Sequence, residues 1–443
     1  MKLIVNPNTP LRGSVGAQLP GDKSISHRAA LFAALANGTS HIENFQVSGV
    51  TRPMLQALTS LGVTWTLDGK NLTVKGHGVK SLKNPSFPMD CGNSATTLRL
   101  LAGAVSGAGL RAILDGTPAL RRRPMERIVE PLRLMGVEIE PSANGAAPLL
   151  IKAREKNQKL RPLQYDMPVA SAQVKSCLML AALGGAGRTV LSEPGLSRDH
   201  TERMLASMGV EIVSSRSDSR YFVEILPPDP FTLSPLDLSL PADPSAAAFL
   251  IVAALITPGS ELELNGLCLN PTRTGLLDVL KEMGGNIVVR NQRTAAGEPV
   301  GDLLVKHSAL KGTHIAGEMV VRMIDEFPIL AVAAAVADGT TTVRDARELR
   351  LKESDRISML AAELRLLGVN IEEQADGFTI RGGDVSGAVV QSHSDHRLAM
   401  SLAVAGLVAH QPVTIHNAQC TAESFPGFAE LLNELGANLQ RED

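Results

Sequence analysis

The chain has 443 residues, long enough for about two or three domains with substantial hydrophobic cores. Its charge is nearly balanced, with 43 Lys and Arg against 45 Asp and Glu, which argues against a dedicated nucleic-acid or membrane-surface binder. With only 10 Phe, 2 Tyr and 1 Trp, it also offers few aromatic rings on which bases could stack.

The cysteines and the N-terminal residues indicate a reduced, cytoplasmic setting. Cys91, Cys177, Cys268 and Cys420 are far apart in sequence and form no CxxC pair, so neither a zinc site of paired cysteines nor a disulfide framework is expected. The N-terminal stretch MKLIVNPNTPLRG lacks the apolar run of a signal peptide. The longest apolar run, AAAFLIVAALI, is about half a membrane span, so no transmembrane helix is expected.

A helix-like segment that ends in Leu-Gly or Met-Gly and leads into a short strand recurs along the chain. The glycines are Gly62, Gly136, Gly209, Gly284, Gly368 and Gly436, at spacings of 74, 73, 75, 84 and 68 residues. A glycine directly after an amphipathic helix is a common left-handed C-terminal cap. Repeats of this length, six in all, nearly fill the chain.

Each repeat also contains an Ala- and Leu-rich helix that opens with a short polar residue. The predicted N-caps are Ser26, Ser94, Ser171, Ser245, Asp325 and Asp395. Turns and β-branched stretches follow most of these helices, so each repeat is predicted to be βαβαββ. The first helix is apolar nearly all round and is expected to be buried, whereas the second is amphipathic and is expected at the surface.

A repeat can also indicate a solenoid scaffold that binds partners and performs no chemistry. Solenoid repeats are usually about 20–50 residues long, and their terminal repeats differ from the rest. The present repeats are longer, and every one has an apolar inner helix. This favours closed globular domains of the α/β (α+β) class.

Polar side chains concentrate where the apolar helices begin. A helix start presents unpaired N–H groups and a partial positive charge, and so attracts anions. Beside these starts lie Lys23, Ser24 and Arg28, then Asn93, Thr96 and Thr97, then Ser171, Gln173 and Lys175, and finally His396 and Arg397. If the repeats pack equivalently, these starts converge, and we expect a shared site for a polyanion.

Two further charged stretches contribute candidate residues. The three arginines of LRRRP are by themselves typical of a solvated surface. In ELRLKESDRI, a helix would place Lys352 and Arg356 on one face with Glu353 adjacent. Beside the paired carboxylates Asp325 and Glu326, these residues form a candidate acid–base group in a basic cleft.

No metal site or nucleotide-binding loop is predicted. The histidines show no HxxxH or HxH spacing; His393 and His396 are close, but a third zinc ligand is not evident. The stretch GDKS resembles the end of a phosphate loop without its preceding glycine, so ATP chemistry of that type is not expected.

Ten motifs, in order from about residue 12 to residue 428, resemble those of the 5-enolpyruvylshikimate-3-phosphate synthase family. They are PGDKSISHR, DCGNSATTLRLLAG, LRRRPMERIVEPL, ASAQVKSC, SRDHTERML, NPTRTG, GEPVGDL, IDEFPILAVAAA, ELRLKESDRI and SDHRLAM. ASAQVKS and NPTRTG resemble the branch called class II. The resemblance covers nearly the whole chain, and several of the motifs are individually specific.

The resemblance implies a fold and a reaction. The fold is a two-domain inverse α/β barrel with three βαβαββ repeats per domain and helix N-termini that face an interdomain cleft. One domain would be residues 21–240, the other 1–20 plus 241–443, with hinges near Pro20–Gly21 and Pro241. The implied reaction, part of the shikimate pathway of aromatic amino acid biosynthesis, transfers the enolpyruvyl group of phosphoenolpyruvate to the 5-hydroxyl of shikimate 3-phosphate and releases phosphate. The implied enzyme is a cytoplasmic monomer without metal or organic cofactor that binds neither nucleic acid nor membrane.

The resemblance also assigns residues to the two substrates. For shikimate 3-phosphate it implies Lys23, Ser24, Arg28, Ser171, Ala172 (through its backbone), Gln173, Arg198, Asp325 and Lys352. For phosphoenolpyruvate it implies Lys23, Ala95, Arg123, Gln173, Arg356 and Arg397. Arginine suits this task because its planar fork binds two oxygens of a carboxylate or phosphate at once.

The implied chemistry needs one proton removed from the 5-hydroxyl and one added to the methylene carbon of phosphoenolpyruvate. Asp325 is the predicted base, and Glu353 and Lys23 are the predicted proton donors or shuttles. Protonating carbon near neutral pH needs a raised pKa for Glu353 or a lowered pKa for Lys23. Closure of the two domains is expected to exclude water.

Three positions depart from the family pattern. Ala95 stands where many relatives have glycine, and its methyl group is predicted to exclude the inhibitor glyphosate, which is longer than phosphoenolpyruvate. Glu423 stands where some relatives carry a lysine, so no substrate ligand is predicted there. The stretch SGVT lacks acidic residues common at this point, and Asp22 or another acid is expected to compensate for Lys23.

Three alternatives stay open from the sequence. UDP-N-acetylglucosamine enolpyruvyl transferase has a Lys-Asn pair near its start and often a reactive cysteine, whereas this chain has Lys23-Ser24 and no cysteine in DGTPALRRRPM. An RNA-end phosphate cyclase would need a histidine nucleophile, for which His393 is the weak candidate. A non-catalytic scaffold would not require acid–base residues in a basic cleft. Ser26 is predicted to be a plain N-cap and His27 a structural residue.

Overall fold

The structure is a computed structural model that describes residues 1–7, 9–217 and 220–442. Its internal contacts divide the chain into two compact units. Unit 1 comprises Met1–Pro20, Pro241–Thr294 and Pro299–Asp443, and unit 2 comprises Gly21–Leu240 and Ala295–Glu298. Within the described ranges, no helix is both long enough and apolar enough to cross a bilayer. The predicted hinges near residues 20 and 241 stay a prediction.

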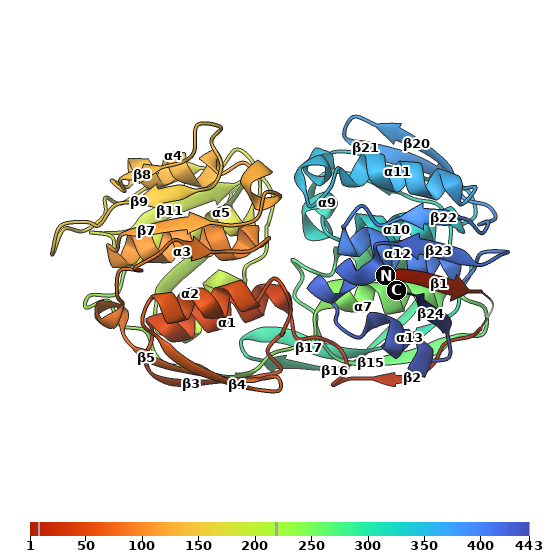
Figure 1. Cartoon of the computed structure of the whole chain (residues 1–443), viewed down its shortest axis with the longest axis horizontal. Helices are drawn as coiled ribbons and strands as arrows, with labels where there is room; N and C mark the ends of the chain where they lie inside the picture. The colour runs from red at the N-terminus through yellow and green to blue at the C-terminus, as the bar shows by residue number, and fades with distance from the viewer. Residues whose placement is uncertain (8, 218–219, 443) are drawn as a thin grey trace. The chain divides into compact units, whose positions relative to one another are not determined.

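The described residues of unit 2 form three four-stranded sheets and six α-helices (Figure 1). The sheets are β14(Asp237–Ser239)-β3(Asn37–Glu43)-β5(Asn71–His77)-β4(Thr64–Asp68), β6(Met89–Asp90)-β7(Ala112–Asp115)-β9(Leu149–Ile151)-β8(Ile139–Glu140) and β10(Gln164–Asp166)-β11(Thr189–Glu193)-β13(Arg220–Leu226)-β12(Glu211–Ser217). The helices are α1(Lys23–Leu35), α2(Arg52–Ser60), α3(Ala95–Ala108), α4(Glu126–Leu134), α5(Ala172–Ala182) and α6(His200–Ser207), with short 3₁₀ turns η1(Val79–Ser81) and η2(Leu120–Arg122).

Unit 1 has the same plan, and the part of it that the structure describes also forms three four-stranded sheets. The sheets are β22(Val389–Gln391)-β23(Val413–His416)-β1(Lys2–Asn6)-β24(Asn438–Glu442), β16(Asn286–Ala295)-β17(Glu298–Lys306)-β15(Glu261–Cys268)-β2(Arg12–Val15) and β18(His314–Ile315)-β19(Thr340–Val343)-β21(Gly377–Arg381)-β20(Asn370–Gln374). The helices are α7(Pro244–Ile256), α8(Gly275–Glu282), α9(Glu318–Arg322), α10(Phe327–Ala335), α11(Arg356–Leu366), α12(His396–Gly406) and α13(Phe428–Glu434), with 3₁₀ turns η3(Arg347–Leu351) and η4(Ala418–Glu423).

These six sheets confirm the predicted fold class, an inverse α/β barrel of six βαβαββ repeats. Three repeats, however, borrow a strand from a distant part of the chain. β14 lies parallel to β3, β2 lies parallel to β15, and β1 pairs antiparallel with both β23 and β24. These three repeats are therefore not contiguous segments, and a period in the sequence does not reveal their pairings.

The six repeat glycines are left-handed, as predicted. Their φ angles are 82° at Gly62, 93° at Gly136, 97° at Gly209, 94° at Gly284, 78° at Gly368 and 109° at Gly436. Each follows the C-cap residue of a surface helix, a position at which glycine adopts positive φ without a steric penalty.

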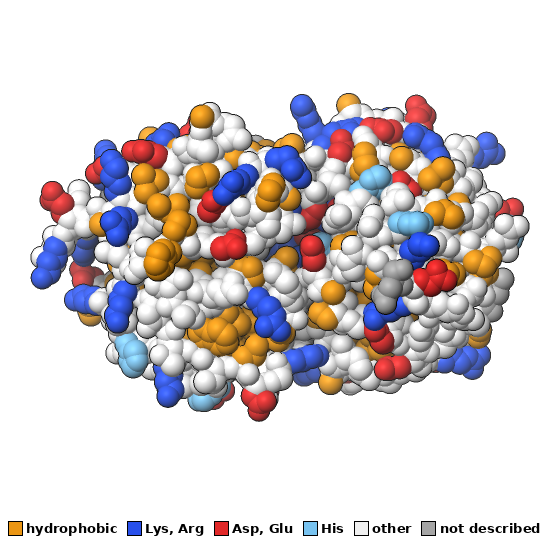
Figure 2. All heavy atoms as spheres, in the orientation of Figure 1, with side chains coloured by type: hydrophobic (Ala, Val, Ile, Leu, Met, Phe, Trp, Pro, Cys, Tyr) orange, Lys and Arg blue, Asp and Glu red, His pale blue; other side chains and the backbone are white. Residues whose placement is uncertain are grey.

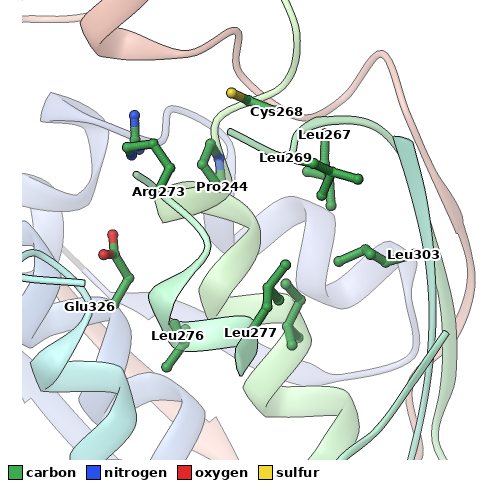
Figure 3. Close-up of a pocket in the computed structure, with 10 residues that line it drawn as sticks. Pro244, Leu267, Cys268, Leu269, Arg273, Leu276, Leu277, Leu303 and Glu326 are labelled. Atoms are coloured by element: carbon green, nitrogen blue, oxygen red, sulfur yellow. The ribbon is translucent and has the colours of Figure 1, made fainter. Parts of the chain in front are cut away.

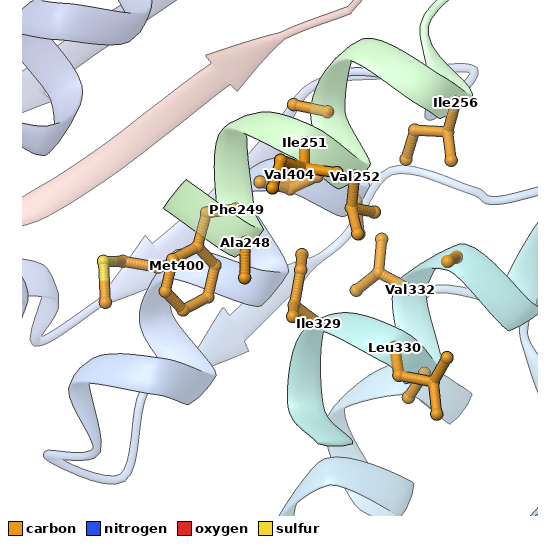
Figure 4. Close-up of a cluster of buried hydrophobic side chains, with 14 of the residues drawn as sticks. Ala248, Phe249, Ile251, Val252, Ile256, Ile329, Leu330, Val332, Met400 and Val404 are labelled. Carbon is orange, nitrogen blue, oxygen red and sulfur yellow. The ribbon is translucent and has the colours of Figure 1, made fainter. Parts of the chain in front are cut away.

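The apolar helices form the cores of both units, also as predicted. In unit 1, α7, α10 and α12 pack against one another (Figure 1). Figure 4 shows Phe249 and Val252 of α7, Ile329 of α10, and Met400 and Val404 of α12 pointing into one cluster. All five side chains are at most 2% exposed. Burying one such side chain contributes about 1.5–3 kcal/mol to the stability of the fold. These helices have no polar face to present to water and are therefore buried.

Three of the six predicted N-caps are confirmed, those of Ser94, Ser171 and Asp395. Ser26 is not a cap because α1 begins earlier, after Asp22, whose Oδ1 accepts from Ile25 N at 2.9 Å. Ser26 Oγ instead accepts from Gln46 N at 3.0 Å.

The caps predicted at Ser245 and Asp325 are also wrong. α7 begins with Pro244, which favours the first helical position, and its cap is Asp243. α10 begins after Glu326, whose side chain makes no capping hydrogen bond. Asp325 therefore lies just outside the helix, and its carboxylate is directed to other partners.

His27 is the fifth residue of α1 and is 1% exposed. Its Nδ1 is 2.8 Å from the carbonyl oxygen of Lys23, and its Nε2 is 3.0 Å from that of Val50. Burial lowers the pKa of His27 to about 4, with the charges of Lys23 and Arg28 acting in the same direction. The imidazole is thus a neutral, structural group near pH 7, in line with its predicted role.

Replacing His27 with Gln should flatten the pH dependence of stability. Because the pKa of His27 is lower in the folded chain than in the unfolded chain, the unfolded chain binds the proton first as pH falls below about 6.5. Between pH 7 and 5, the free energy of unfolding of the wild type should fall by about 2 kcal/mol from this group alone. Urea unfolding followed by the fluorescence of Trp65, the single Trp of the chain, measures this fall in unit 2.

The matched control is His41→Gln, which changes an exposed histidine on β3 of the same unit and should keep the wild-type pH dependence. If the free energy of unfolding falls equally with pH in the wild type and in His27→Gln, His27 is not a buried neutral group.

Candidate active site

In unit 1, basic side chains surround the carboxylate of Asp325. Its Oδ1 lies 3.2 Å from Lys352 Nζ and 3.6 Å from Arg356 Nη1. Its Oδ2 lies 3.9 Å from Arg397 Nη2, and Arg397 Nη1 donates to the backbone oxygen of Asp325 at 2.9 Å. Glu353 joins the group through Arg356 Nη2 at 2.7 Å. All five residues that the sequence assigned to this unit therefore lie together.

Arg356 and Asp395 form a buried ion pair at the centre of the group. Arg356 Nε donates to Asp395 Oδ2 at 2.8 Å and Nη2 donates to Oδ1 at 3.2 Å, with exposed fractions of 1% and 0%. Desolvation works to lower the pKa of Arg356, but Asp395, Glu353 and Asp325 together raise it above its ordinary value. Arg356 facing Asp395 holds the pKa of that carboxyl low despite its burial. Both side chains are therefore charged near pH 7.

Asp395 also fixes the start of α12. Its Oδ1 accepts from Arg397 N at 2.9 Å, and its Oδ2 accepts from Ser354 Oγ at 3.0 Å. One carboxylate thus connects the cap of α12 with Arg356, the first residue of α11. Both arginines lie close to the carboxylate of Asp325, Arg356 Nη1 at 3.6 Å from Oδ1 and Arg397 Nη2 at 3.9 Å from Oδ2.

The predicted helix through Lys352 and Arg356 is wrong. α11 begins only at Arg356, and its cap is Asp355, whose Oδ1 accepts from Ser358 N at 3.1 Å. Lys352 follows η3 with extended backbone, φ −84° and ψ −154°. The two cations reach Asp325 from a loop and a helix start, not from one helix face.

A second polar group next to this cluster joins Glu326, which the sequence paired with Asp325, to Arg273 and Asp243, for which no role was predicted. Glu326 Oε1 lies 3.5 Å from Arg397 Nη1 and also accepts a hydrogen bond from Ser245 Oγ. Arg273 Nη2 donates to Ser245 Oγ and to Asp243 Oδ1, both at 2.9 Å. Arg273 belongs to the motif NPTRTG, and Asp243 directly precedes an apolar helix, so both carried a signal that the sequence analysis left unused.

Figure 3 shows Arg273 and Glu326 on the wall of a small cavity whose other lining residues are mostly apolar. Its volume is about 10 Å³, at most enough for one water molecule. The cavity is too small for a substrate. The recorded contacts of these two side chains are with neighbouring protein groups.

In unit 2, Arg28 holds three elements together. Its Nη1 donates to Ser24 O at 2.9 Å, its Nε donates to Thr201 Oγ1 at 2.7 Å, and its Nη2 donates to Ser176 Oγ at 2.7 Å. It is 2% exposed, and burial lowers its pKa to about 10, so it stays charged near pH 7. Arg198 Nη1 donates to Ser24 Oγ at 3.2 Å. The predicted shikimate ligands Ser24, Arg28 and Arg198 are therefore neighbours.

Gln173 is the centre of a second group in unit 2. Its Oε1 accepts from Arg99 Nη1 at 2.6 Å, and its Nε2 donates to Thr96 Oγ1 at 3.0 Å. Arg99 Nη2 also donates to Pro124 O at 3.0 Å, one residue from the predicted ligand Arg123. Arg99 was missed by the sequence analysis, although a basic residue inside an otherwise apolar helix is itself a signal.

The other predicted residues of unit 2 lie at helix starts. Lys23, Ala95 and Ala172 are the first residues of α1, α3 and α5. Ser171 caps α5 with its Oγ 3.5 Å from Val174 N. First-turn N–H groups have no partner within their own helix and are suitable donors to phosphate. The compensation of Lys23 by Asp22 stays a prediction.

Comparison with known proteins decides the family. Residues 5–432 match the family model described as EPSP synthase (3-phosphoshikimate 1-carboxyvinyltransferase). The chain belongs to the EPSP synthase family.

Relatives of the full length agree with this assignment. The 3-phosphoshikimate 1-carboxyvinyltransferase of Geobacter sp. (strain M21) is 47% identical over 433 residues, covering 97% of this chain and 98% of the relative. That of Salinibacter ruber is 46% identical over 444 residues, covering 99% of this chain and 100% of the relative.

Solved structures agree as well. EPSP synthase from Acinetobacter baumannii is 40% identical, with a TM-score of 0.87 over 99% of both chains. The enolpyruvyl transferase NikO from Streptomyces tendae is 22% identical over 99% of this chain and 98% of its own, with a TM-score of 0.78, and shares the fold.

Proposed function

We propose that this EPSP synthase family member transfers the enolpyruvyl group of phosphoenolpyruvate to the 5-hydroxyl of shikimate 3-phosphate and releases phosphate. The observation that carries the proposal is the carboxylate of Asp325 with Lys352, Arg356 and Arg397 around it, in a chain that matches the family over residues 5–432. A base beside several anion-binding groups is what this reaction requires. The family resemblance further supports a cytoplasmic monomer with hinges near residues 20 and 241.

Asp325 is the proposed base. It accepts the proton of the 5-hydroxyl while Lys352, 3.2 Å from its Oδ1, binds the same part of the shikimate ring. A positioned carboxylate contributes a factor of about 10²–10⁴ to such a proton transfer.

Arg356 is a proposed ligand of phosphoenolpyruvate, and one of its nitrogens supports this role. Its Nε and Nη2 are bonded to Asp395 and Glu353, but the buried Nη1 makes no hydrogen bond and lies 3.6 Å from Asp325. That nitrogen can donate to a phosphate or carboxylate oxygen of the substrate. Arg397, Arg123 and the N–H groups at the start of α3 supply further donors.

Glu353 and Lys23 are the proposed proton donors to the methylene carbon. Glu353 Oε2 lies 2.7 Å from Nη2 of Arg356, so its carboxyl group is next to a proposed ligand of phosphoenolpyruvate.

The activity is tested by mixing the purified protein with shikimate 3-phosphate and phosphoenolpyruvate and measuring released phosphate. Turnover is expected, and the variants Lys23→Met and Asp325→Ala should each lower it by about 100-fold or more. Asp384→Ala removes a carboxylate whose side chain is 88% exposed and should leave turnover unchanged. Absence of phosphate release from the wild type, or full activity of Asp325→Ala, would contradict the proposal. Release with UDP-N-acetylglucosamine instead of shikimate 3-phosphate would favour the other transferase.

Ala95 is proposed to make the enzyme tolerant of glyphosate. It is the first residue of α3 and 3% exposed, so its methyl group occupies space that glycine would leave open. Ala95→Gly should lower the glyphosate concentration that halves activity by about 10-fold or more, with the KM for phosphoenolpyruvate changed only a few-fold. Inhibition assays at fixed phosphoenolpyruvate measure this shift.

The control is Ala104→Gly, which makes the same change at a buried position within α3 and should leave inhibition by glyphosate unaltered. If Ala95→Gly is inhibited no better than the wild type, the steric explanation is wrong.

A further inference from the structure

The first turn of α6 holds two of the predicted shikimate ligands in place. Arg198 lies two residues before this helix and donates to Ser24 Oγ at 3.2 Å. Thr201, in the first turn, accepts from Arg28 Nε at 2.7 Å. The N-cap residue, Asp199, makes no capping hydrogen bond with its side chain. The orientation of this turn therefore depends on contacts other than its own cap.

One such contact comes from the tip between β16 and β17. The four residues Ala295–Glu298 cluster with unit 2, whereas the strand residues on both sides, through Thr294 and from Pro299, cluster with unit 1. At this tip, Glu298 Oε1 accepts a hydrogen bond from His200 Nδ1 at 2.7 Å. The side chains of His200 and Glu298 are 0% and 3% exposed. The pair is fully buried although its partners are 98 positions apart in sequence.

Arg203 strengthens the same contact. Its Nη1 donates to Gly297 O at 3.3 Å, and its Nε lies 2.9 Å from Asp199 Oδ2 and 3.8 Å from Glu298 Oε2. Asp199, His200 and Glu298 are close enough to hold a metal ion together, but the guanidinium of Arg203 already lies between the two carboxylates. The arrangement is therefore better explained as a fixed hydrogen-bonded contact than as a metal site.

We propose that Glu298 is a positioning residue for the binding of shikimate 3-phosphate, acting through His200 on Arg198. His200 is the first residue of α6 and lies two positions after Arg198. By binding His200 from the strand tip, Glu298 fixes the first turn of the helix and thereby the positions of Arg198 and Thr201. The inference rests on the proposed function, because the role of Arg198 as a phosphate ligand belongs to that proposal. It gives a role to the motif GEPVGDL, which the reaction itself leaves unused.

The test is Glu298→Gln, which keeps the shape of the side chain and removes its charge. The KM for shikimate 3-phosphate should rise about 10-fold, whereas kcat and the KM for phosphoenolpyruvate should stay within about 2-fold of the wild type. Steady-state kinetics with each substrate varied in turn measures this split. A purely structural role would instead lower the active fraction, and so kcat, without changing either KM.

Two further variants make the result specific. Asp302→Asn alters the same strand away from its tip, where Asp302 accepts from Gly266 N and from Asn291 Nδ2, both at 2.8 Å, and should leave the KM for shikimate 3-phosphate unchanged. His200→Phe removes the other partner and should raise that KM by a similar factor. The double variant of Glu298→Gln and His200→Phe should bind no worse than the weaker single variant, because both disrupt one contact.

Binding of shikimate 3-phosphate measured by calorimetry, without turnover, separates this inference from the proposed function. If the wild type binds shikimate 3-phosphate and releases no phosphate with phosphoenolpyruvate, the proposed function fails while Glu298 is still tested. Unchanged affinity in Glu298→Gln, or an equal loss in Asp302→Asn, would overturn the inference. If Glu298→Gln does not fold, His200→Phe provides the same comparison.

Discussion

The buried ion pair of Arg356 and Asp395 is the interaction on which the unit 1 half of the site depends. Removing two charges from water is costly, and the pair offsets this cost through the two hydrogen bonds that Arg356 donates to Asp395. The same carboxylate caps α12, so one contact sets the positions of Arg356 and Arg397. Asp325 precedes α10, and its carboxylate lies close to both arginines and to Lys352. Replacing the pair with apolar residues would keep a core but lose the geometry of the site.

Unit 2 organises its polar residues in the same way. Lys175 is buried between Glu193 and Glu202, at 2.7 Å from each, and its pKa is raised to about 12, because the two carboxylates outweigh its desolvation. Arg28 connects α1 to α5 and α6. In both units, buried charges hold helix starts in place, where the first-turn N–H groups have no partner within their own helix. On the face drawn in Figure 2, basic and acidic side chains are interspersed instead of forming one basic patch, in line with the balanced net charge.

Features set by the local sequence pattern could be predicted from the sequence. Features set by contacts between distant residues could not. The Leu-Gly and Met-Gly repeat predicted the left-handed glycines because the cap needs only one residue type at one position. The cap at Ser26 was wrong because Asp22 is an equally suitable cap four residues earlier, and the choice depends on where the chain enters the helix. Arg99 and Glu298 had no visible partner in sequence, since Gln173 and His200 are brought to them only by the fold. The sheets that β1, β2 and β14 join could not be predicted for the same reason, because their partner strands are distant in sequence.

A double-mutant comparison at Arg356 and Asp395 tests most directly whether this buried pair is maintained for the site. Urea unfolding followed by circular dichroism gives the stability, and phosphate release gives the activity. Asp395→Asn keeps the cap of α12 but breaks the ion pair, and should lower the free energy of unfolding by about 3–5 kcal/mol. The double variant with Arg356→Met should recover most of that stability and remain inactive. A single variant as stable as the wild type, or a double variant with full activity, would contradict the account.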